Sequence, residues 1–450
     1  MKVKYVTALL VLFFFPVQAW TLTLDEESKY GREVYLQVAG SAKLYSDPYV
    51  CIQMAIIKGR LEAAADLPFR IKLSIIESPV LDAFATVGGY VFMTTGILEQ
   101  ADDEEEIAGV LGHEFSHVGR RHVAKSVEKE KFINWGMLGA LLLGLLIPSA
   151  AGKAAVMTGG VGAGQTMALK YTREMEAEAD RFGVITCEKA GYNGAGSAEF
   201  LKKMAATGLD KMVPQYLLTH PYSEDRVMTI RQLAKPMKTR VDVSLFPFVV
   251  ARARILSGPV GAQNEDIWLK KYQKDPTDPV SAYGAALVYS LKGDTDRAVA
   301  LVRAINSPYT PLFMGEFFVA GRRFKEAIEV LGGEAHPVAR YFLAKAYEGQ
   351  GDFTTAGRVL KGLAPYAETF PEVYQRMGMV LGREGNEAGG YDYLGRYYLE
   401  TGRYQAATVN LEKAVSKYGI NSPEGEEALK LLDQVKPPDK KKKEIQASAS

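Results

Sequence analysis

Apolar and polar positions along the chain predict helices for most of its length and two short strands near its start. The stretches 71–78 and 88–96 are rich in β-branched and aromatic residues, which is typical of strands. Apolar residues recur with helical spacing over 24–67, 103–131, 171–190 and 197–207. The pattern therefore predicts a mainly α region with a small β-sheet that ends near residue 260.

A repeated helical pattern follows over residues 261–435. Its four copies share a turn glycine, an aromatic residue four positions earlier and an alanine five or six positions later. These residues are Gly293, Gly321, Gly351 and Gly402; Tyr289, Phe317, Tyr347 and Tyr398; and Ala298, Ala327, Ala356 and Ala407. Glycine lets a turn adopt a positive φ, and alanine lets paired helices approach. The pattern resembles tetratricopeptide repeats and predicts an α-solenoid, with an ordinary helical bundle as the alternative.

The two ends of the chain differ from the rest. Residues 1–19 combine Lys2 and Lys4 with an apolar run and end at Ala19, which predicts a secretory signal peptide. An uncleaved N-terminal anchor is the alternative. Residues 436–450 are rich in lysine, and we expect a disordered basic tail. The mature protein is thus expected outside the cytoplasm.

Overall charge and cysteine content narrow the possible functions. The formal net charge is +1, so the composition gives no reason to expect a nucleic-acid partner. The two cysteines, Cys51 and Cys187, form either a disulfide or two buried thiols. They are too few for a zinc site built on cysteine.

The stretch GVLGHEFSHVGRRH, which begins at Gly109, places ionisable residues within an apolar helix. His113 and His117 are four residues apart and share one helix face, so both can bind one zinc ion. Glu114 lies beside them and can take a proton from water, whose pKa zinc lowers to about 7. The alternative is a chance match on a surface helix, but burying three such groups without a metal would be costly.

Further ligands are expected downstream. Glu176, Glu178 and Asp180 lie on one predicted helix, and the first and last of them are one turn apart. One carboxylate can therefore bind zinc while another braces a histidine. A solvated acidic helix face is the alternative.

HEFSH followed by the carboxylates of residues 176–180 resembles the gluzincin family, which includes HtpX, Oma-type and CAAX-prenyl peptidases. With the signal peptide and the repeats, the chain is most similar to BepA-like periplasmic metalloproteases. The resemblance implies an α+β zincin-type metallopeptidase domain over residues 20–260, followed by the solenoid. It also implies one zinc ion bound by His113, His117 and Glu176, with Glu114 as general base and Asp180 bracing a ligand.

The stretch LLTHPYSEDR carries two further expectations from this resemblance. His220 would take the fourth zinc position, displace the catalytic water and keep the enzyme latent; a plain loop histidine is the alternative. Arg226 would face the cleft and stabilise the oxyanion of the scissile carbonyl. A surface ion pair with Glu224 or Asp225 is the alternative for Arg226.

The stretch DAFATVGGYVFMTTG resembles the family's edge strand beside the active site, to which a substrate could add as a further strand. The residues expected to take part are Ala83, Phe84, Ala85, Gly88 and Gly89. A core strand is compatible with this role.

An uncharged segment, 132–152, separates the two halves of the expected zinc site. A single membrane crossing would place His117 and Glu176 on opposite sides, which one shared zinc ion excludes. We expect a helical hairpin over about 132–169 that covers the cleft or touches a membrane face. A buried core helix is the alternative.

These features together predict a periplasmic zinc endopeptidase, with peripheral membrane contact as an option. Its expected substrates are unfolded or misassembled envelope proteins, in quality control and outer-membrane protein assembly. The repeats would bind envelope protein partners on a concave surface. The alternative functions are a chaperone or assembly factor with a closed structural zinc site and little proteolysis, and a hydrolase of another bond, such as an amidase.

Overall fold

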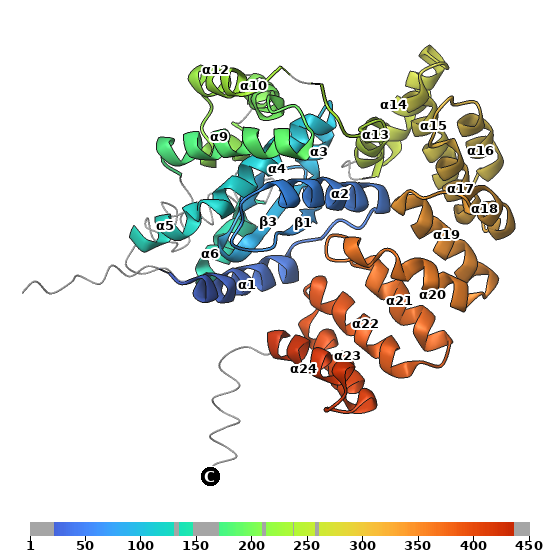
Figure 1. Cartoon of the computed structure of the whole chain (residues 1–450). Coiled ribbons are helices and arrows are strands. Elements are labelled where there is room, and N and C mark those ends of the chain that lie inside the picture. Colours follow the sequence, from blue (N-terminus) through green and yellow to red (C-terminus); the bar gives the residue numbers. More distant parts are fainter. Residues whose placement is uncertain are drawn as a thin grey trace, which may run out of the picture.

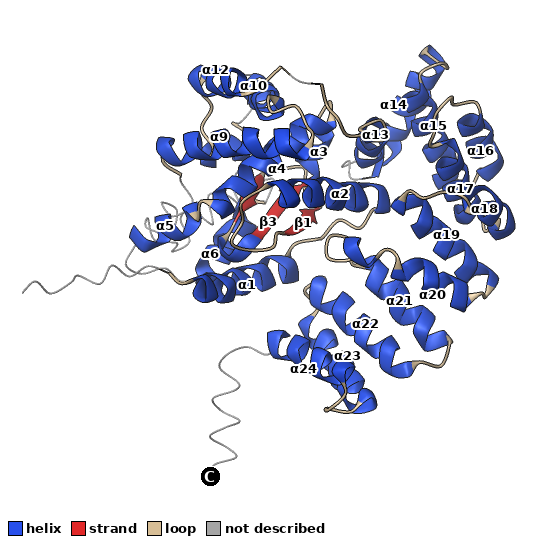
Figure 2. Ribbon diagram, viewed as in Figure 1, coloured by secondary structure: helices blue, strands red, loops and turns tan. Residues whose placement is uncertain are grey.

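The computed structural model describes residues 22–129, 135–146, 171–208, 213–236, 238–256 and 261–435. The expected signal peptide, the basic tail, and residues 132–134 and 147–169 of the expected hairpin lie outside these ranges. Helices account for most of the described chain, together with one small sheet (Figure 2). The predicted mainly α fold with a small β-sheet is therefore confirmed.

The sheet has three strands in the order β1–β3–β2. The strands are β1 (Lys72–Ile76), β2 (Ala83–Ala85) and β3 (Tyr90–Thr94), with β1 parallel and β2 antiparallel to β3. β2 is thus an edge strand, and it ends at Ala85, sooner than expected. Gly88 and Gly89 instead form the turn η1 (Val87–Gly89), where both have positive φ.

Two helices precede the sheet where the sequence pattern was continuous. α1 (Leu24–Ser41) and α2 (Pro48–Ala64) are separated at Asp47, whose carboxylate accepts hydrogen bonds from the amides of Tyr49 and Val50. Proline at the first position of α2 reinforces this start, because it needs no hydrogen-bond acceptor there.

The remaining helices of the N-terminal region include α4, which carries the HEFSH motif (Figure 1). They are α3 (Thr95–Gln100), α4 (Glu104–Gly119), α5 (His122–Lys129), α6 (Trp135–Leu145), α9 (Arg173–Ala190), α10 (Gly196–Gly208), α11 (Gln215–Thr219), α12 (Glu224–Leu233) and α13 (Phe246–Leu256). α4 packs on α9 and α10. Cys51 and Cys187 are both free and buried. They are therefore two buried thiols and not a disulfide.

α6 covers part of the segment expected to form a hairpin. Leu138 and Leu142 are buried against a cluster that includes Val38 of α1 and Phe92 of β3. The described part of the segment is therefore a core helix, as in the alternative. Nowhere in the described ranges is a helix both long enough and apolar enough to span a membrane.

Residues 261–435 form consecutive antiparallel helices that curve in one direction (Figure 1). They are α14 (Gly261–Lys274), α15 (Pro279–Leu291), α16 (Thr295–Arg303), α17 (Thr310–Ala320), α18 (Phe324–Leu331), α19 (Pro337–Gln350), α20 (Phe353–Lys361), η2 (Ala364–Tyr366), α21 (Glu372–Arg383), α22 (Glu387–Glu400), α23 (Tyr404–Tyr418) and α24 (Pro423–Val435). The predicted α-solenoid is confirmed.

The turn glycines follow the prediction with one exception. Gly293, Gly351 and Gly402 have positive φ, but at the second turn Arg322 takes this conformation instead of Gly321. Counted from Arg322, Ala327 lies five positions later, as alanine does in the other three copies. In the second copy the alanine follows the glycine by six positions because Gly321 lies one residue before the residue with positive φ.

The concave side of the solenoid packs on the N-terminal region. Around α2, Tyr49 contacts the rings of Tyr283, Phe313 and Phe342, and its hydroxyl donates to Glu316 of α17 at 2.7 Å. Farther along the solenoid, the Tyr404 hydroxyl donates to the Leu36 carbonyl of α1 at 2.7 Å. 

A second contact at this end joins Lys72 of β1 to Glu400 of α22, with 2.5 Å between Nζ and Oε2. The repeats are thus fixed to the N-terminal region at both ends. Part of the surface that we expected to receive partners is occupied by the protein itself.

Candidate metal centre and active site

Four buried side chains direct ligand atoms towards one point. His113 and His117 come from α4, Glu176 from α9, and His220 follows α11. Nε2 of His113 lies 3.0 Å from Nε2 of His117 and 3.2 Å from Nδ1 of His220. Glu176 Oε1 lies 3.4 Å from His117 Nε2 and 3.0 Å from His220 Nδ1.

These separations fit a zinc ion. Ligand atoms about 2.0–2.1 Å from a tetrahedral zinc lie about 3.3 Å from one another. Three imidazole nitrogens that converge on a carboxylate in a buried site also need a shared cation or proton between them. The donor set, three histidines and one carboxylate, is one that zinc prefers.

Glu114 lies beside this cluster and contacts the edge strand. It is completely buried, and its Oε2 accepts a hydrogen bond from the Ala85 amide at 3.0 Å. Its Oε1 lies 3.4 Å from His220 Nε2. Burial raises the pKa of Glu114, so the carboxylate binds a proton more readily than a carboxylate in water.

The backbone of β2 faces the cluster with alternate residues. Asp82 and Thr86 exchange hydrogen bonds with β3, so the polar groups of Leu81, Ala83 and Ala85 point the other way. The Ala85 amide reaches Glu114, and the Leu81 carbonyl accepts from the Tyr216 amide at 3.0 Å. The α11 segment therefore lies along part of the edge at which a substrate strand would add.

Asp180 and Arg226 form a supporting layer behind the ligands. Asp180 Oδ1 lies 2.9 Å from His113 Nδ1 and thus holds the ring from the side away from the cluster. Arg226 donates to Asp180 through Nε and Nη2, both at 2.8 Å. Its Nη1 lies 2.7 Å from Glu176 Oε2 and 2.9 Å from the Pro221 carbonyl.

The position of Arg226 differs from both sequence expectations. Its ion-pair partners are Asp180 and Glu176, whereas the sequence alternative named Glu224 or Asp225. Because every guanidinium nitrogen already has a protein partner, the geometry favours a role in holding carboxylates over oxyanion binding.

The electrostatics of the cluster favour a charged Glu176. Burial would raise the pKa of Glu176, but His220, His117 and His113 outweigh it and hold the pKa well below its usual range. Burial lowers the pKa of His220, yet Glu176 and Glu114 together raise it to about 8. Each group thus depends on its neighbours for its charge state.

Two residues beside the cluster received no role from the sequence. The Tyr171 ring lies on the His117 ring, with 3.8 Å between their centroids, and it also contacts His220. His122 is completely buried and contacts His117. In the sequence, the one sign that Tyr171 could lie near the site is its position just before the helix that carries Glu176.

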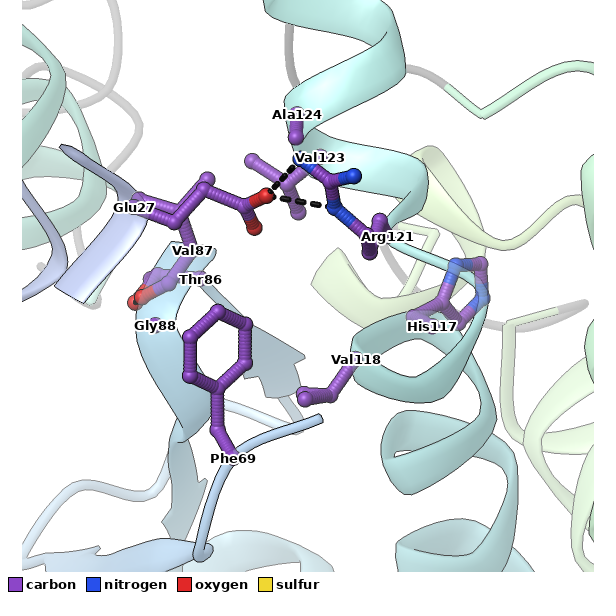
Figure 3. Close-up of a pocket in the computed structure, with 10 residues that line it drawn as sticks. All are labelled: Glu27, Phe69, Thr86, Val87, Gly88, His117, Val118, Arg121, Val123 and Ala124. Carbon is purple, nitrogen blue, oxygen red and sulfur yellow. Dashed lines mark hydrogen bonds and ion pairs between the residues drawn. The ribbon is translucent and has the colours of Figure 1, made fainter. Parts of the chain in front are cut away.

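A small cavity lies beside His117 (Figure 3). It is bounded by His117 and Val118 of α4, Phe69, and the turn at Val87 and Gly88. Figure 3 shows the Glu27–Arg121 ion pair across from Phe69, with His117 at the side. The cavity therefore adjoins both a candidate ligand and the end of the edge strand.

Comparisons with known proteins agree with this geometry. Residues 53–234 match the sequence profile of peptidase family M48. The putative β-barrel assembly-enhancing protease of Vibrio cholerae is 32% identical over 295 residues, covering 63% of this chain and 60% of the relative. The β-barrel assembly-enhancing protease of Escherichia coli is 30% identical over 281 residues, or 59% and 56% of the two chains.

More distant similarities exist as well. The human mitochondrial metalloendopeptidase OMA1 is 26% identical over 223 residues, covering 46% of this chain and 42% of the relative. Among solved structures, a match to the APC/C hetero-tetramer Cut9–Hcn1 covers 74% of this chain and 69% of the other chain, with 12% identity. Its TM-score of 0.32 is too low to indicate a shared fold. The chain spans little more than half the length of the bacterial relatives. Over residues 53–234, the chain carries a peptidase family M48 domain.

Proposed function

We propose that the protein is a zinc-dependent endopeptidase that acts on unfolded or misassembled proteins of the bacterial envelope. One observation carries this proposal: the ligand atoms of His113, His117 and Glu176 converge directly beside a buried carboxylate, Glu114. A purely structural zinc site has no use for such a carboxylate. The names of the bacterial relatives support a link to β-barrel assembly.

Peptide hydrolysis needs a polarised carbonyl, an activated water and a proton for the leaving amine. Zinc, when bound, polarises the carbonyl and lowers the pKa of water. Glu114 would take a proton from the attacking water and deliver it to the amine nitrogen, so that water adds across the broken bond. The raised pKa of Glu114 suits both transfers. The Ala85 amide keeps the carboxylate next to the edge strand.

The substrate would lie along β2 as an extended segment. Main-chain groups at the edge of β2 offer hydrogen bonds that do not depend on sequence, which suits an enzyme for unfolded chains. The Tyr216 amide of α11 donates to the Leu81 carbonyl at this edge, and His220 offers a fourth ligand atom to the cluster. We propose that residues 214–220 must leave before a substrate binds, so that the enzyme rests in a latent state.

The repeats would bind envelope partners, and the predicted signal peptide would direct the protein to the periplasm. Since α1 and α2 occupy much of the concave side, partners would use the remaining surface of the solenoid. Peripheral contact with a membrane stays an option.

The alternative function is that of a chaperone or assembly factor with a closed zinc site. The His220 nitrogen that lies within the cluster supports this alternative, because a fourth protein ligand would give the fully ligated zinc of a structural site. In that case α11 would stay in place, and binding of unfolded chains by the repeats would be the activity.

Cleavage of an unfolded protein such as casein separates the two functions. The proteins to compare are wild type, His220→Ala, Glu114→Gln and the double variant, each with its zinc content measured. We expect His220→Ala to cut at least tenfold faster than wild type and both Glu114→Gln proteins to be inactive with zinc bound. Inactivity of all four zinc-loaded proteins would instead support the chaperone.

A further inference from the structure

His117 is braced from behind by a second histidine, which itself contacts a carboxylate. His117 Nδ1 lies 3.0 Å from His122 Nδ1, and His122 Nε2 lies 3.0 Å from Glu178 Oε2. The His122 side chain is completely buried, whereas that of Glu178 is 39% exposed. A line of contacts therefore runs from the metal centre through His122 to the surface.

The hydrogen bonds along this line have a single consistent direction. His117 Nε2 points into the cluster, so its lone pair is needed for zinc and the ring proton resides on Nδ1. His117 Nδ1 then donates to His122 Nδ1, and His122 Nε2 donates to the Glu178 carboxylate. Each ring is thereby fixed in one tautomer.

A strained turn brings His122 to His117. Five residues along an unbroken helix would place the two side chains about 140° apart around its axis. Instead α4 ends at Gly119, Arg121 takes a φ of 55°, and α5 begins at His122. This left-handed conformation is unfavourable for a residue other than glycine, because its Cβ approaches the following carbonyl oxygen.

Contacts with the N-terminal segment hold Arg121 in this conformation. Its Nε donates to the buried carboxylate of Glu27 at 2.6 Å (Figure 3). Its Nη2 donates to the Leu22 carbonyl. The fold thus maintains an unfavourable backbone conformation at the position that turns His122 back to the metal centre.

α9 supports both histidines of the HEFSH motif. Asp180 contacts His113 directly, at 2.9 Å, and Glu178 reaches His117 through His122. A carboxylate behind a metal-binding imidazole orients the ring and raises the basicity of the nitrogen that binds the metal.

We propose that His122 and Glu178 are positioning residues that orient His117 for zinc and strengthen its bond to the metal. This inference rests on the proposed function in one respect, namely that His117 binds zinc. It assigns Glu178 a role other than that of a direct ligand.

Zinc affinity of the metal-free full-length protein tests the proposal without any substrate. A chromogenic chelator competes for zinc with wild type, His122→Leu, His122→Asn and Glu178→Gln. Glu174→Gln is the matched control, because it removes the same charge from the same helix in an exposed position. Circular dichroism of the metal-free proteins confirms folding.

We expect the dissociation constant for zinc to rise about 10- to 100-fold in His122→Leu and about tenfold in Glu178→Gln. His122→Asn retains an acceptor near His117 and should recover part of the affinity. In the cobalt-substituted protein, the visible absorption bands should shift for His122→Leu and not for Glu174→Gln.

Unchanged zinc affinity and cobalt spectrum in Glu178→Gln and in folded His122→Leu would overturn the proposal. Glu178→Gln keeps the test decisive if His122→Leu does not fold, because Glu178 is partly exposed. If wild type binds no zinc and His117→Ala makes no difference, the proposed function itself fails. Tight zinc binding that needs His117 but ignores Glu178 would refute this inference alone.

Discussion

At the scale of single residues, glycines on α4 decide how closely the helices of the site approach. A Cβ on Gly109 would lie 2.2 Å from the Ser197 amide nitrogen of α10. A Cβ on Gly112 would lie 2.8 Å from the Cys187 sulfur of α9. Since His113 and Glu176 sit on α4 and α9, the separation of these helices sets the separation of two candidate ligands.

We predict that Gly109→Ala lowers both the thermal unfolding temperature and the zinc affinity, because α10 must move away from α4. Gly59→Ala is the control: it lies within α2, and its Cβ would meet nothing within 4 Å. This control should raise the free energy of unfolding by about 1 kcal/mol through helix propensity. Thermal melts of both variants, with and without zinc, check the prediction. A Gly109→Ala protein that melts like wild type would contradict it.

At the scale of elements, the start of α2 and the start of α21 meet at a buried carboxyl group. Burial of Glu372 raises its pKa to about 7, and its Oε2 has no hydrogen-bond partner among the described residues. Asp47, at the start of α2, adds to the shift through its negative charge. The junction therefore favours a protonated Glu372.

This junction predicts that stability falls as the pH rises. Between the ordinary pKa of 4.5 and the folded value of about 7, the folded protein holds a proton that the unfolded chain has lost. The free energy of unfolding should therefore decrease from pH 5 to pH 7.5. Glu372→Gln should abolish this pH-dependent part of the free energy of unfolding. The variant should therefore be more stable than wild type at pH 7.5 and as stable as wild type near pH 4.5. Urea denaturation at both pH values measures the difference, and parallel curves would contradict the prediction.

At the scale of the whole molecule, the last repeats close onto the N-terminal region. Gly402, in the turn between α22 and α23, has a φ of 72°, and a Cβ there would lie 2.5 Å from the backbone of Ala39 and Gly40. Tyr404 and Glu400 on either side make hydrogen bonds to α1. This turn therefore fastens the end of the solenoid to α1.

We predict that Gly402→Ala releases α22–α24 from α1. Gly351→Ala is the matched control, since Gly351 has a φ of 82° but nothing lies within 4 Å of its added Cβ. Both variants carry the same left-handed strain, of about 1–2 kcal/mol, and only Gly402→Ala breaks the contact. Limited proteolysis should cut Gly402→Ala faster around residue 402, and small-angle scattering should show a larger radius of gyration. Equal behaviour of the two variants would contradict the prediction.

The sequence by itself determined the features that depend on local spacing. Histidines four residues apart must share a helix face, and a glycine, an aromatic residue and an alanine at fixed intervals predict helix–turn–helix units. Hence the mainly α fold, the sheet, the solenoid and the grouping of His113, Glu114 and His117 could be predicted. For the second turn, the sequence predicted a positive φ at Gly321, whereas Arg322 adopts it. Packing around a single turn sets its φ, and the glycine pattern does not reveal that packing.

Only the tertiary structure decided the contacts between distant segments. Arg226 pairs with Asp180 and Glu176, since α12 lies beside α9, a proximity that no local pattern reveals. His122 reaches His117 only because Arg121 interrupts the helix, and helical periodicity would place them apart. The convergence of the ligands and the closure of the solenoid on α1 and α2 both arise from packing between segments that are distant in the sequence. The spacing of residues along the sequence does not reveal such packing.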